Sequence, residues 1–305
     1  MRTGAPTGAR SLSGGAFATL LLIAFMMGAN HVAARLAFDH GVDVATAVSV
    51  RSAVTAGVLG LLLWWQGVPL RLQRHHRHAL PAIGLLIGVQ SLCLYAAVAR
   101  LPVALALLAF NTYPLWTALW ARLAYAHRPE PRVLRAMPLL LLGLALALDV
   151  FGAATGLGVA GQWSRIGVGV AFALAAAATF GLALVLTQHE AGDLDGRVRT
   201  ASTLMIVAVI ALVGVGSQGG FHFPDAAAGW WGLAALTFLY GTAFTIMFTV
   251  LPRLGVVGHS AIMNVEPIFA LVLAWALLGQ TIAALQVAGG LLVVGTVIWL
   301  GLRRS

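Results

Sequence analysis

The sequence predicts an all-α polytopic membrane protein whose ten transmembrane helices form two inverted five-helix repeats. Three observations predict this fold class. The composition is 60% hydrophobic and 9% charged, with a mean hydropathy of +0.94, which lies outside the range of ordinary soluble domains. The apolar residues fall into runs near the ~20 residues that a helix needs to cross a bilayer. Finally, the second half repeats polar residues of the first half at a fixed spacing.

Ten apolar segments, separated by turn and charge signals, account for the ten helices. They are residues 16–38, 44–66, 79–100, 102–125, 134–152, 165–188, 200–217, 228–251, 254–278 and 281–302. Helices are expected because backbone polar groups in lipid must be satisfied within the segment, and because the runs are too long for barrel strands. The first run is too long for a signal-peptide core and carries Asn30, His31 and Arg35, so we expect it to persist as a membrane helix.

Pairs of residues 153 positions apart define the repeat. These pairs are Gly28 and Gly181, Arg100 and Arg253, Asn111 and Asn264, and Pro114 and Pro267. We therefore expect a first repeat over residues 1–153 and a second over residues 154–305. Because five is an odd number of helices, the second repeat must enter the membrane upside down. An inverted duplication of this kind is typical of transporters.

Arginine residues set the expected orientation. All 18 basic residues are arginine, and most of them fall in short loops on one side of the predicted bundle. That side holds Arg2, Arg10, Arg71, Arg74, Arg77, Arg128, Arg132, Arg135, Arg197, Arg199, Arg253, Arg303 and Arg304. The positive-inside rule makes this side cytoplasmic, together with both termini. The net charge of +9 thus orients the chain in a bacterial inner membrane and does not indicate a nucleic-acid partner.

Polar side chains inside the spans are the candidate substrate-binding residues, because polar groups are costly in lipid and usually face a cavity or another helix. The first choices for a central cavity are Asn30, Gln90, Tyr95, Asn111, Thr245, Phe248 and Asn264. Asn111 and Asn264 gain weight from the repeat, as do Tyr95 and its counterpart Phe248. The alternative for each polar residue is a hydrogen bond that only holds two helices together.

Two prolines and one acidic residue extend this candidate site. Pro114 and Pro267 should each kink a helix near mid-membrane, and we assign them a hinge role, although a kink that only shapes the helix is an open alternative. Glu266 is the acidic residue placed near mid-membrane, which makes it a candidate proton carrier for antiport. Alternatively, it caps backbone amides freed by the kink or pairs with a basic residue.

The other charged residues are expected to have structural roles. Arg35 and Arg51 lie toward the outer ends of their helices, near Asp39 and Asp43, and should snorkel or pair there. The histidines of residues 75–78 could bind metal, but they sit in an arginine-rich loop, so we expect an electrostatic anchor to anionic lipid.

Enzyme chemistry finds no support in the sequence. There is no P-loop, HExxH or CxxC motif and no local Ser-His-Asp set, and the loops are too small for a catalytic domain. Cys93 is the single cysteine and lies in an apolar run, which indicates an inert thiol. We expect no cofactor, no metal and no enzymatic activity.

Several motifs resemble the drug/metabolite transporter superfamily. They are Met27-Gly28-Ala29-Asn30-His31, Arg51, Tyr95 before Arg100, Pro114 and Glu266-Pro267. The segments Leu278-Gly279-Gln280-Thr281 and Gln286-Val287-Ala288-Gly289-Gly290 resemble the end of the EamA repeat, although that family usually has an acidic residue in place of Gln280. The resemblance covers nearly the whole chain. Within the superfamily, the chain is most similar to YddG-type exporters of aromatic and other amino acids.

This resemblance implies an exporter of small metabolites, with amino acids as the first expectation. Its partners would be a small-molecule substrate and the lipid bilayer, and a monomer is expected. Drug or other metabolite efflux by proton antiport, and facilitation without ion coupling, are alternatives within the same class. Two alternatives belong to other classes: a membrane-embedded lipid-modifying enzyme, which would need a clustered catalytic set, and a non-transporting receptor or assembly subunit.

Overall fold

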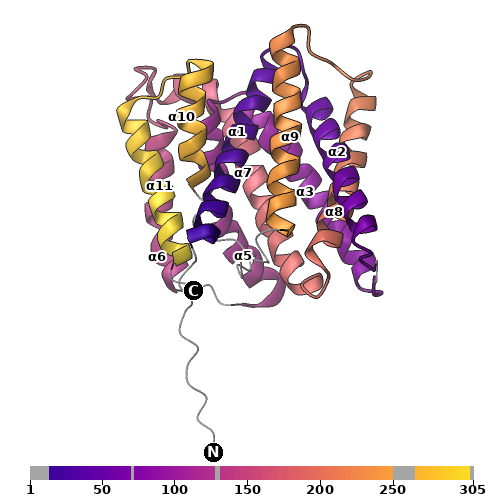
Figure 1. Cartoon of the computed structure of the whole chain (residues 1–305). Coiled ribbons are helices and arrows are strands. Elements are labelled where there is room, and N and C mark those ends of the chain that lie inside the picture. The colour runs from indigo at the N-terminus through magenta and orange to yellow at the C-terminus, as the bar shows by residue number, and fades with distance from the viewer. Residues whose placement is uncertain (1–13, 70–71, 128–130, 250–264, 303–305) are drawn as a thin grey trace, which may run out of the picture.

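A computed structural model describes residues 14–69, 72–127, 131–249 and 265–302, and within these ranges the chain is a helical bundle without strands (Figure 1). The first half contains α1 (Gly14–Phe38), α2 (Val44–Trp65), α3 (His76–Val98), α4 (Val103–Phe110), α5 (Tyr113–Tyr125) and α6 (Pro131–Ala147). The second half contains α7 (Gly158–Glu190), α8 (Gly196–Ser217), α9 (Ala227–Thr249), α10 (Glu266–Leu278) and α11 (Ala284–Leu302). The expected all-α membrane fold is confirmed.

These segments correspond to the ten expected spans. Helices α4 and α5 together make one span, Val103–Tyr125, and α10 is the described part of the expected segment 254–278. Among the described residues, seven helices are long and apolar enough to cross a membrane, and α6, α10 and α11 are shorter apolar helices. In Figure 1, α1 begins and α11 ends at the same face of the bundle.

Helix α7 begins at Gly158, seven residues before the expected start at 165. The hydropathy of its first two turns is lowered by Gln162, which is nevertheless buried. Its amide nitrogen donates to the carbonyl of Leu148 at 2.9 Å, and its amide oxygen accepts a bond from Thr155 at 3.2 Å. Because these bonds hold the chain against the end of α6, the helix extends beyond its most apolar part.

The fourth span is broken where Pro114 predicted a kink. Helix α4 ends at Phe110, a turn follows at Asn111 and Thr112, and α5 begins at Tyr113 with the proline in its first turn. Proline cannot donate a backbone hydrogen bond, so the turn before it loses a partner. Within this turn, the hydroxyl and the backbone N–H of Thr112 both donate to the carbonyl of Ala109, at 2.8 and 3.2 Å.

In the second repeat, α10 copies α5. Both have 13 residues and a proline in the first turn. Both end at a residue in the left-handed conformation, Ala126 with φ 54° and Gly279 with φ 63°, and the backbone N–H of each end residue bonds to a carbonyl five positions back. These end residues are again 153 positions apart, so the spacing found in the sequence also relates the two half-helices in space.

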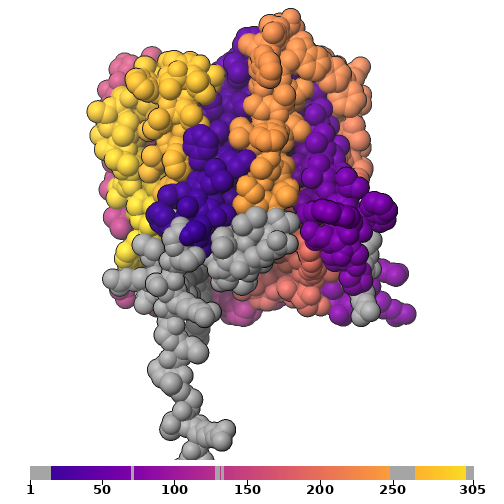
Figure 2. Space-filling view, viewed as in Figure 1, coloured from indigo at the N-terminus to yellow at the C-terminus, as the bar shows by residue number. Residues whose placement is uncertain are grey.

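Each half-helix is crossed by a helix of the other repeat at a glycine. A Cβ atom on Gly28 of α1 would lie 2.9 Å from the carbonyl oxygen of Glu266 in α10. A Cβ atom on Gly181 of α7 would lie 2.8 Å from the backbone nitrogen of Thr117 in α5. Figure 2 shows α1 between α10 and α9 on one face of the bundle. The repeats are thus interleaved, since α1 packs on α9 and α10 while α3 packs on α7 and α8.

The main hydrophobic core surrounds α4, in which residues 103–109 are all buried. Helices α6 and α11 pack against each other beside this core. Their contact depends on small residues, because a Cβ atom on Gly143 would lie 3.0 Å from the carbonyl oxygen of Gly289.

Candidate functional site

Two of the sequence-predicted site residues meet in the interior. The hydroxyl of Tyr95 in α3 donates to the side-chain oxygen of Asn30 in α1 at 3.0 Å, and both side chains are fully buried. The amide nitrogen of Asn30 has no hydrogen-bond partner in the described part of the chain. A buried donor without a partner costs about 1–3 kcal/mol, so this amide is suited to receive an incoming acceptor.

Arg51 is the residue that the sequence analysis placed wrongly. It was expected to snorkel or pair near Asp39 and Asp43, but its side chain is 3% exposed. The guanidinium carbon lies 4.3 Å from the ring centre of Tyr95 and 4.0 Å from that of Tyr240. Contacts of this kind are worth about 2 kcal/mol each when they are shielded from water.

The two aspartates are occupied by other partners. Asp39 pairs with Arg35 at 2.9 Å. Asp43 caps α2 by accepting from the backbone nitrogen of Thr46 at 2.9 Å, and it also contacts His222 at 3.1 Å. Burial of Asp43 works against its ionisation, but these hydrogen bonds hold the pKa of its carboxyl below the ordinary value. Arg51 consequently turns inward, and it has no ion pair with any described residue.

Glu266 completes a buried polar centre, which we define as Asn30, His31, Arg51, Tyr95 and Glu266. Its carboxylate oxygen lies 3.3 Å from Nε2 of His31, and the ring of His31 lies 5.5 Å from that of Tyr95. Glu266 is about one-quarter exposed, whereas the other four side chains are almost fully buried. The centre therefore combines a carboxylate, an imidazole, an amide, a phenol and a guanidinium inside the membrane.

Helix α2 contributes a second polar feature that the sequence analysis missed. Ser49, Ser52 and Thr55 are buried, and their hydroxyls lack hydrogen-bond partners in the described part of the chain, as does Nε of Arg51. A helix face of small hydroxyls beside a cation is compatible with a polar ligand. The available signal was Arg51 itself, eight residues inside an apolar helix, where a charge is too deep to reach the interface.

The other predicted residues that the structure describes are distributed over α3, the break between α4 and α5, and α9. Asn111 is buried at the break between α4 and α5, and its amide nitrogen has no partner among the described residues. Gln90 is 9% exposed and accepts a long bond of 3.4 Å from Ser91. Thr245 donates to the carbonyl of Gly241 at 2.8 Å. Phe248 belongs to α9, but its side chain is outside the described part, and Asn264 is outside the described residues altogether.

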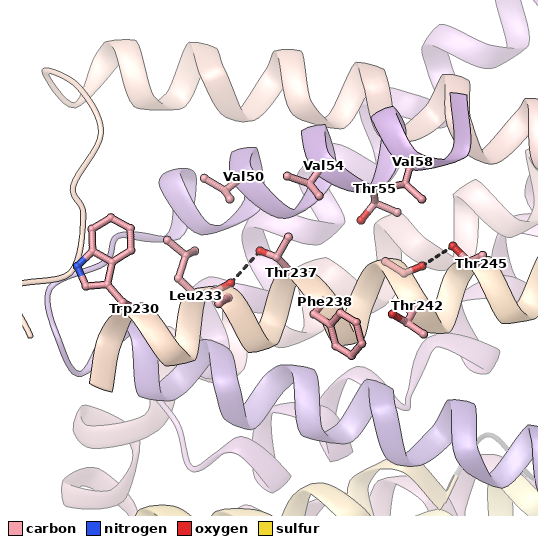
Figure 3. A pocket seen from close by; sticks show the side chains of 12 residues that line it. Val50, Val54, Thr55, Val58, Trp230, Leu233, Thr237, Phe238, Thr242 and Thr245 are labelled. Carbon is pink, nitrogen blue, oxygen red and sulfur yellow. Dashed lines mark hydrogen bonds between the residues drawn. The ribbon is translucent and has the colours of Figure 1, made fainter. Parts of the chain in front are cut away.

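Thr245 lies on a groove between α2 and α9 with a volume of about 650 Å³ (Figure 3). Its walls are mostly apolar, with Val50, Val54 and Val58 from α2 and Phe238 from α9. The remaining lining residues are Thr55, Trp230, Leu233, Ala234, Thr237, Gly241 and Thr242. Many of the walls are exposed at the bundle surface, so the groove would open to the lipid.

The repeat allows the seam that holds the groove to be compared with the related seam of the other half. On the related side of the molecule, Gly84 and Gly88 of α3 are filled by Ile206 and Ile210 of α8, since a Cβ atom on either glycine would lie 2.7 Å from the isoleucine side chain. At 153 positions earlier than these isoleucines, α2 carries Ala53 and Gly57. A Cβ atom on Gly57 would meet nothing within 4 Å. The seam between α3 and α8 is thus closed, and the seam between α2 and α9 is open.

The floor of the groove approaches the buried polar centre. A Cβ atom on Gly241 would lie 3.2 Å from the hydroxyl of Thr55. Thr55 is one helical turn from Arg51 on α2, and Gly241 follows Tyr240 on α9. The groove and the contacts of the guanidinium thus involve neighbouring residues of the same two helices.

Comparison with known proteins agrees with this architecture. The model of the EamA-like transporter family matches residues 14–148 and 167–302, one match in each half of the chain. A solved structure described as "Crystal structure of protein" is similar over 97% of this chain and 100% of its own, with a TM-score of 0.63 and 18% sequence identity. At this identity the likeness shows the fold alone. No curated protein gave a significant sequence match.

Proposed function

Since the chain belongs to the EamA-like transporter family, we propose that it exports amino acids, including aromatic ones, from the cytoplasm across a bacterial inner membrane. Family membership makes the protein a multi-pass membrane transporter of small molecules. The proposal adds the substrate class, the direction and the mechanism, which is alternating access through a cavity between the repeats. It also assigns both termini to the cytoplasm and takes the transporter to be a monomer.

The observation that carries the proposal is the pair of opposite charges in the buried polar centre. Arg51 is a buried cation with no ion pair in the described part of the chain, and Glu266 is a carboxylate near mid-membrane. An amino acid brings both complementary charges. Its carboxylate would bind the guanidinium, and its ammonium group would bind Glu266 and the oxygen of Asn30. A planar guanidinium binds a carboxylate through two parallel hydrogen bonds.

Aromatic side chains support a substrate with an apolar or aromatic side chain. Tyr95 and Tyr240 face the guanidinium from two helices, and the ring of Phe244 lies 4.5 Å from that of Tyr240. Rings pack on aromatic side chains with a favourable geometry and at low entropic cost. In the proposal, Phe248 and Thr245 belong to the same helix face and complete the site in another conformation of the cycle.

The broken helices provide the moving parts of the proposed mechanism. Pro114 and Pro267 each stand in the first turn of a half-helix, and the chain before each proline carries an asparagine, Asn111 or Asn264. Rotation about these breaks would expose the centre to one side of the membrane and then to the other. Asn111, Asn264 and Gln90 would then contact the substrate or the opened backbone.

Proton antiport is the second candidate for the driving force. The contact of 3.3 Å between Glu266 and His31 joins two groups that can exchange a proton, and intramembrane pairs of this kind form proton relays in pumps. If Glu266 carries the proton, export is driven by the proton gradient. If it binds only the ammonium group, the protein is a facilitator.

Reconstituted liposomes with purified protein test the proposal. We would measure the exchange of labelled phenylalanine, methionine and threonine with and without a pH gradient. Phenethylamine and phenylacetate, which lack one charge each, serve as matched competitors. Inhibition by phenylalanine but only weakly by either competitor is the expected result.

Two outcomes would decide against parts of this proposal. If neither exchange nor competition occurs for any amino acid, the substrate is another metabolite or a drug. If a pH gradient accelerates wild type and Glu266→Gln equally, Glu266 does not carry the coupled proton. The variant is nearly isosteric and keeps an acceptor for His31, so it separates charge from shape.

A further inference from the structure

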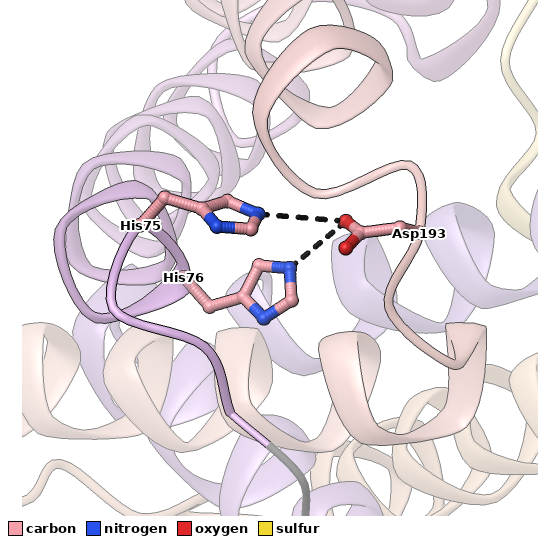
Figure 4. Close-up of side chains that lie close together, drawn as sticks. All are labelled: His75, His76 and Asp193. Carbon is pink, nitrogen blue, oxygen red and sulfur yellow. Dashed lines mark hydrogen bonds and ion pairs between the residues drawn. The ribbon is translucent and has the colours of Figure 1, made fainter.

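Three side chains from two separate connections meet at one end of the bundle. His75 and His76 stand at the start of α3, and Asp193 lies in the connection between α7 and α8. Both imidazoles direct Nε2 toward the same carboxylate oxygen, at 3.6 Å from His75 and 2.9 Å from His76 (Figure 4). The two rings lie 4.0 Å apart, centre to centre. The cluster therefore joins one repeat to the other.

The sequence analysis expected these histidines to be an electrostatic anchor to lipid, and the structure gives two of them a partner within the protein. His76 is 2% exposed, whereas His75 and Asp193 are about half exposed. The backbone N–H of Gln73 donates to Nδ1 of His76 at 3.2 Å, and the side-chain amide nitrogen of Gln73 donates to Asp193 at 3.4 Å. The hydrogen bond from His76 holds the pKa of Asp193 below its usual value. These contacts hold the cluster in place.

We propose that His75, His76 and Asp193 bind a divalent transition metal ion such as Zn²⁺, which clamps the two repeats together at this end of the bundle. Ligand atoms around one zinc ion lie about 3–3.5 Å from each other, given bonds of about 2.0–2.2 Å. The measured separations of 2.9 and 3.6 Å from the carboxylate oxygen bracket this range. All three ligand atoms lie within 4.8 Å of one another, so only small side-chain rotations are needed.

The ligand set determines the class of metal. Two imidazoles and one carboxylate suit Zn²⁺, Co²⁺ or Ni²⁺, whereas Mg²⁺ prefers oxygen ligands and keeps its water. Arg74 and Arg77 are exposed beside the histidines, so the surroundings of the site are positively charged. These surroundings also disfavour a cation such as Mg²⁺, which would be held by charge alone. Arg197, in the first turn of α8, is paired with Asp195 at 2.7 Å.

Metal binding changes the hydrogen bonding of His76. Without metal, Nδ1 accepts from Gln73, so Nε2 carries the proton and donates it to Asp193. The metal takes the place of this proton, and the proton moves to Nδ1, which ends the bond from Gln73. Losing one ordinary hydrogen bond lowers the affinity by about five- to tenfold, which leaves room for strong binding because metal–ligand bonds are far stronger.

Calorimetric titration with Zn²⁺ tests the proposal. The full-length protein is used, with an affinity tag that contains no histidine. Wild type is expected to bind one ion per chain and to gain thermal stability in proportion to the logarithm of the zinc concentration. Asp193→Asn and His75→Ala should each weaken binding by at least about tenfold. Asp193→Asn keeps an acceptor for His76, and His75 is half exposed, so both variants should fold. Mg²⁺ should have no effect.

His78→Ala is the matched control, because His78 is exposed on the same helix and lies outside the cluster. It should bind zinc like wild type. The proposal is overturned if wild type binds no zinc, or if Asp193→Asn and His75→Ala bind it as tightly as wild type. The cluster would then be a hydrogen-bonded contact between the connections and nothing more. These readouts do not depend on the identity of the transported substrate.

Discussion

Replacing Arg51 gives the sharpest test of the buried polar centre. Its guanidinium lies between two tyrosine rings and lacks an ion pair in the described part of the chain. Hydrogen bonds to a charged partner contribute about 1.5–3 kcal/mol. Arg51→Met should therefore weaken the binding of a substrate carboxylate by about 3 kcal/mol. At about 1.4 kcal/mol per factor of ten, this corresponds to a rise of about 150-fold in the KM for phenylalanine.

Arg51→Lys should have an intermediate effect. Lysine keeps the charge but loses the planar group that stacks between Tyr95 and Tyr240 and binds a carboxylate at two points. We expect a loss of about 1–2 kcal/mol, or about 5- to 30-fold in KM. Arg77→Lys, at an exposed position, is the control and should change KM by less than about twofold.

The assay is transport in reconstituted liposomes, with phenylalanine and phenylalaninamide compared for each variant. The amide lacks the negative charge, so its KM should be nearly the same in wild type and Arg51→Met. The comparison is a double-mutant cycle between the side chain and the substrate carboxylate. If Arg51→Met raises both KM values by the same factor, then Arg51 supports the fold of the site and does not bind the carboxylate.

Three further predictions concern stability and packing. Gly28→Ala should destabilise the protein by about 1–3 kcal/mol and lower its melting temperature, because the new Cβ would press on the carbonyl of Glu266. Gly60→Ala is the control and should be neutral or slightly stabilising, since its Cβ meets nothing within 4 Å; equal changes in melting temperature for the two variants would contradict this. Gly57→Ile should raise the melting temperature by filling the open seam between α2 and α9, as Ile210 fills the closed seam between α3 and α8. Gly60→Ile is the control and should not raise it. A lower melting temperature for Gly57→Ile alone would contradict this and show that the groove is needed for packing. Asp43→Ala should lower the free energy of unfolding by about 0.5–2 kcal/mol at neutral pH through loss of the α2 cap, while Asp43→Asn keeps the cap. Because folding lowers the pKa of Asp43, the stabilisation by its charge is complete above the unfolded pKa of about 3.9 and is lost as the pH falls through the folded pKa. A difference in stability between wild type and Asp43→Asn that grew on acidification would refute this assignment.

The sequence predicted the spans and their repeat well, because both depend on local signals. Hydropathy located most of the described helices to within a few residues, with the start of α7 and the end of α6 as exceptions. Pro114 predicted the break in the fourth span, since proline acts on the turn that contains it. The spacing of 153 positions was visible without any structure, and the two half-helices follow it.

The position of Arg51 could not be predicted in the same way. Its orientation depends on Tyr240, which lies 189 positions away, and on the prior use of Asp39 and Asp43 by other partners. Such competition among side chains is a property of the folded molecule. The groove between α2 and α9 was hidden for a related reason, because its walls come from two helices that are far apart in the chain.

The unequal seams have a consequence for the energetics of the transport cycle. A carrier with two identical halves would have inward-facing and outward-facing states of equal free energy, because exchanging the conformations of the halves would turn one state into the other. Here Ile206 and Ile210 fill the seam on one side, while Ala53 and Gly57 stand at the related positions. The two end states must therefore bury different side chains. In the proposed alternating-access cycle, the resting direction of the empty carrier would thus be set partly at its lipid-facing surface, where evolution could adjust it without changing what the protein binds.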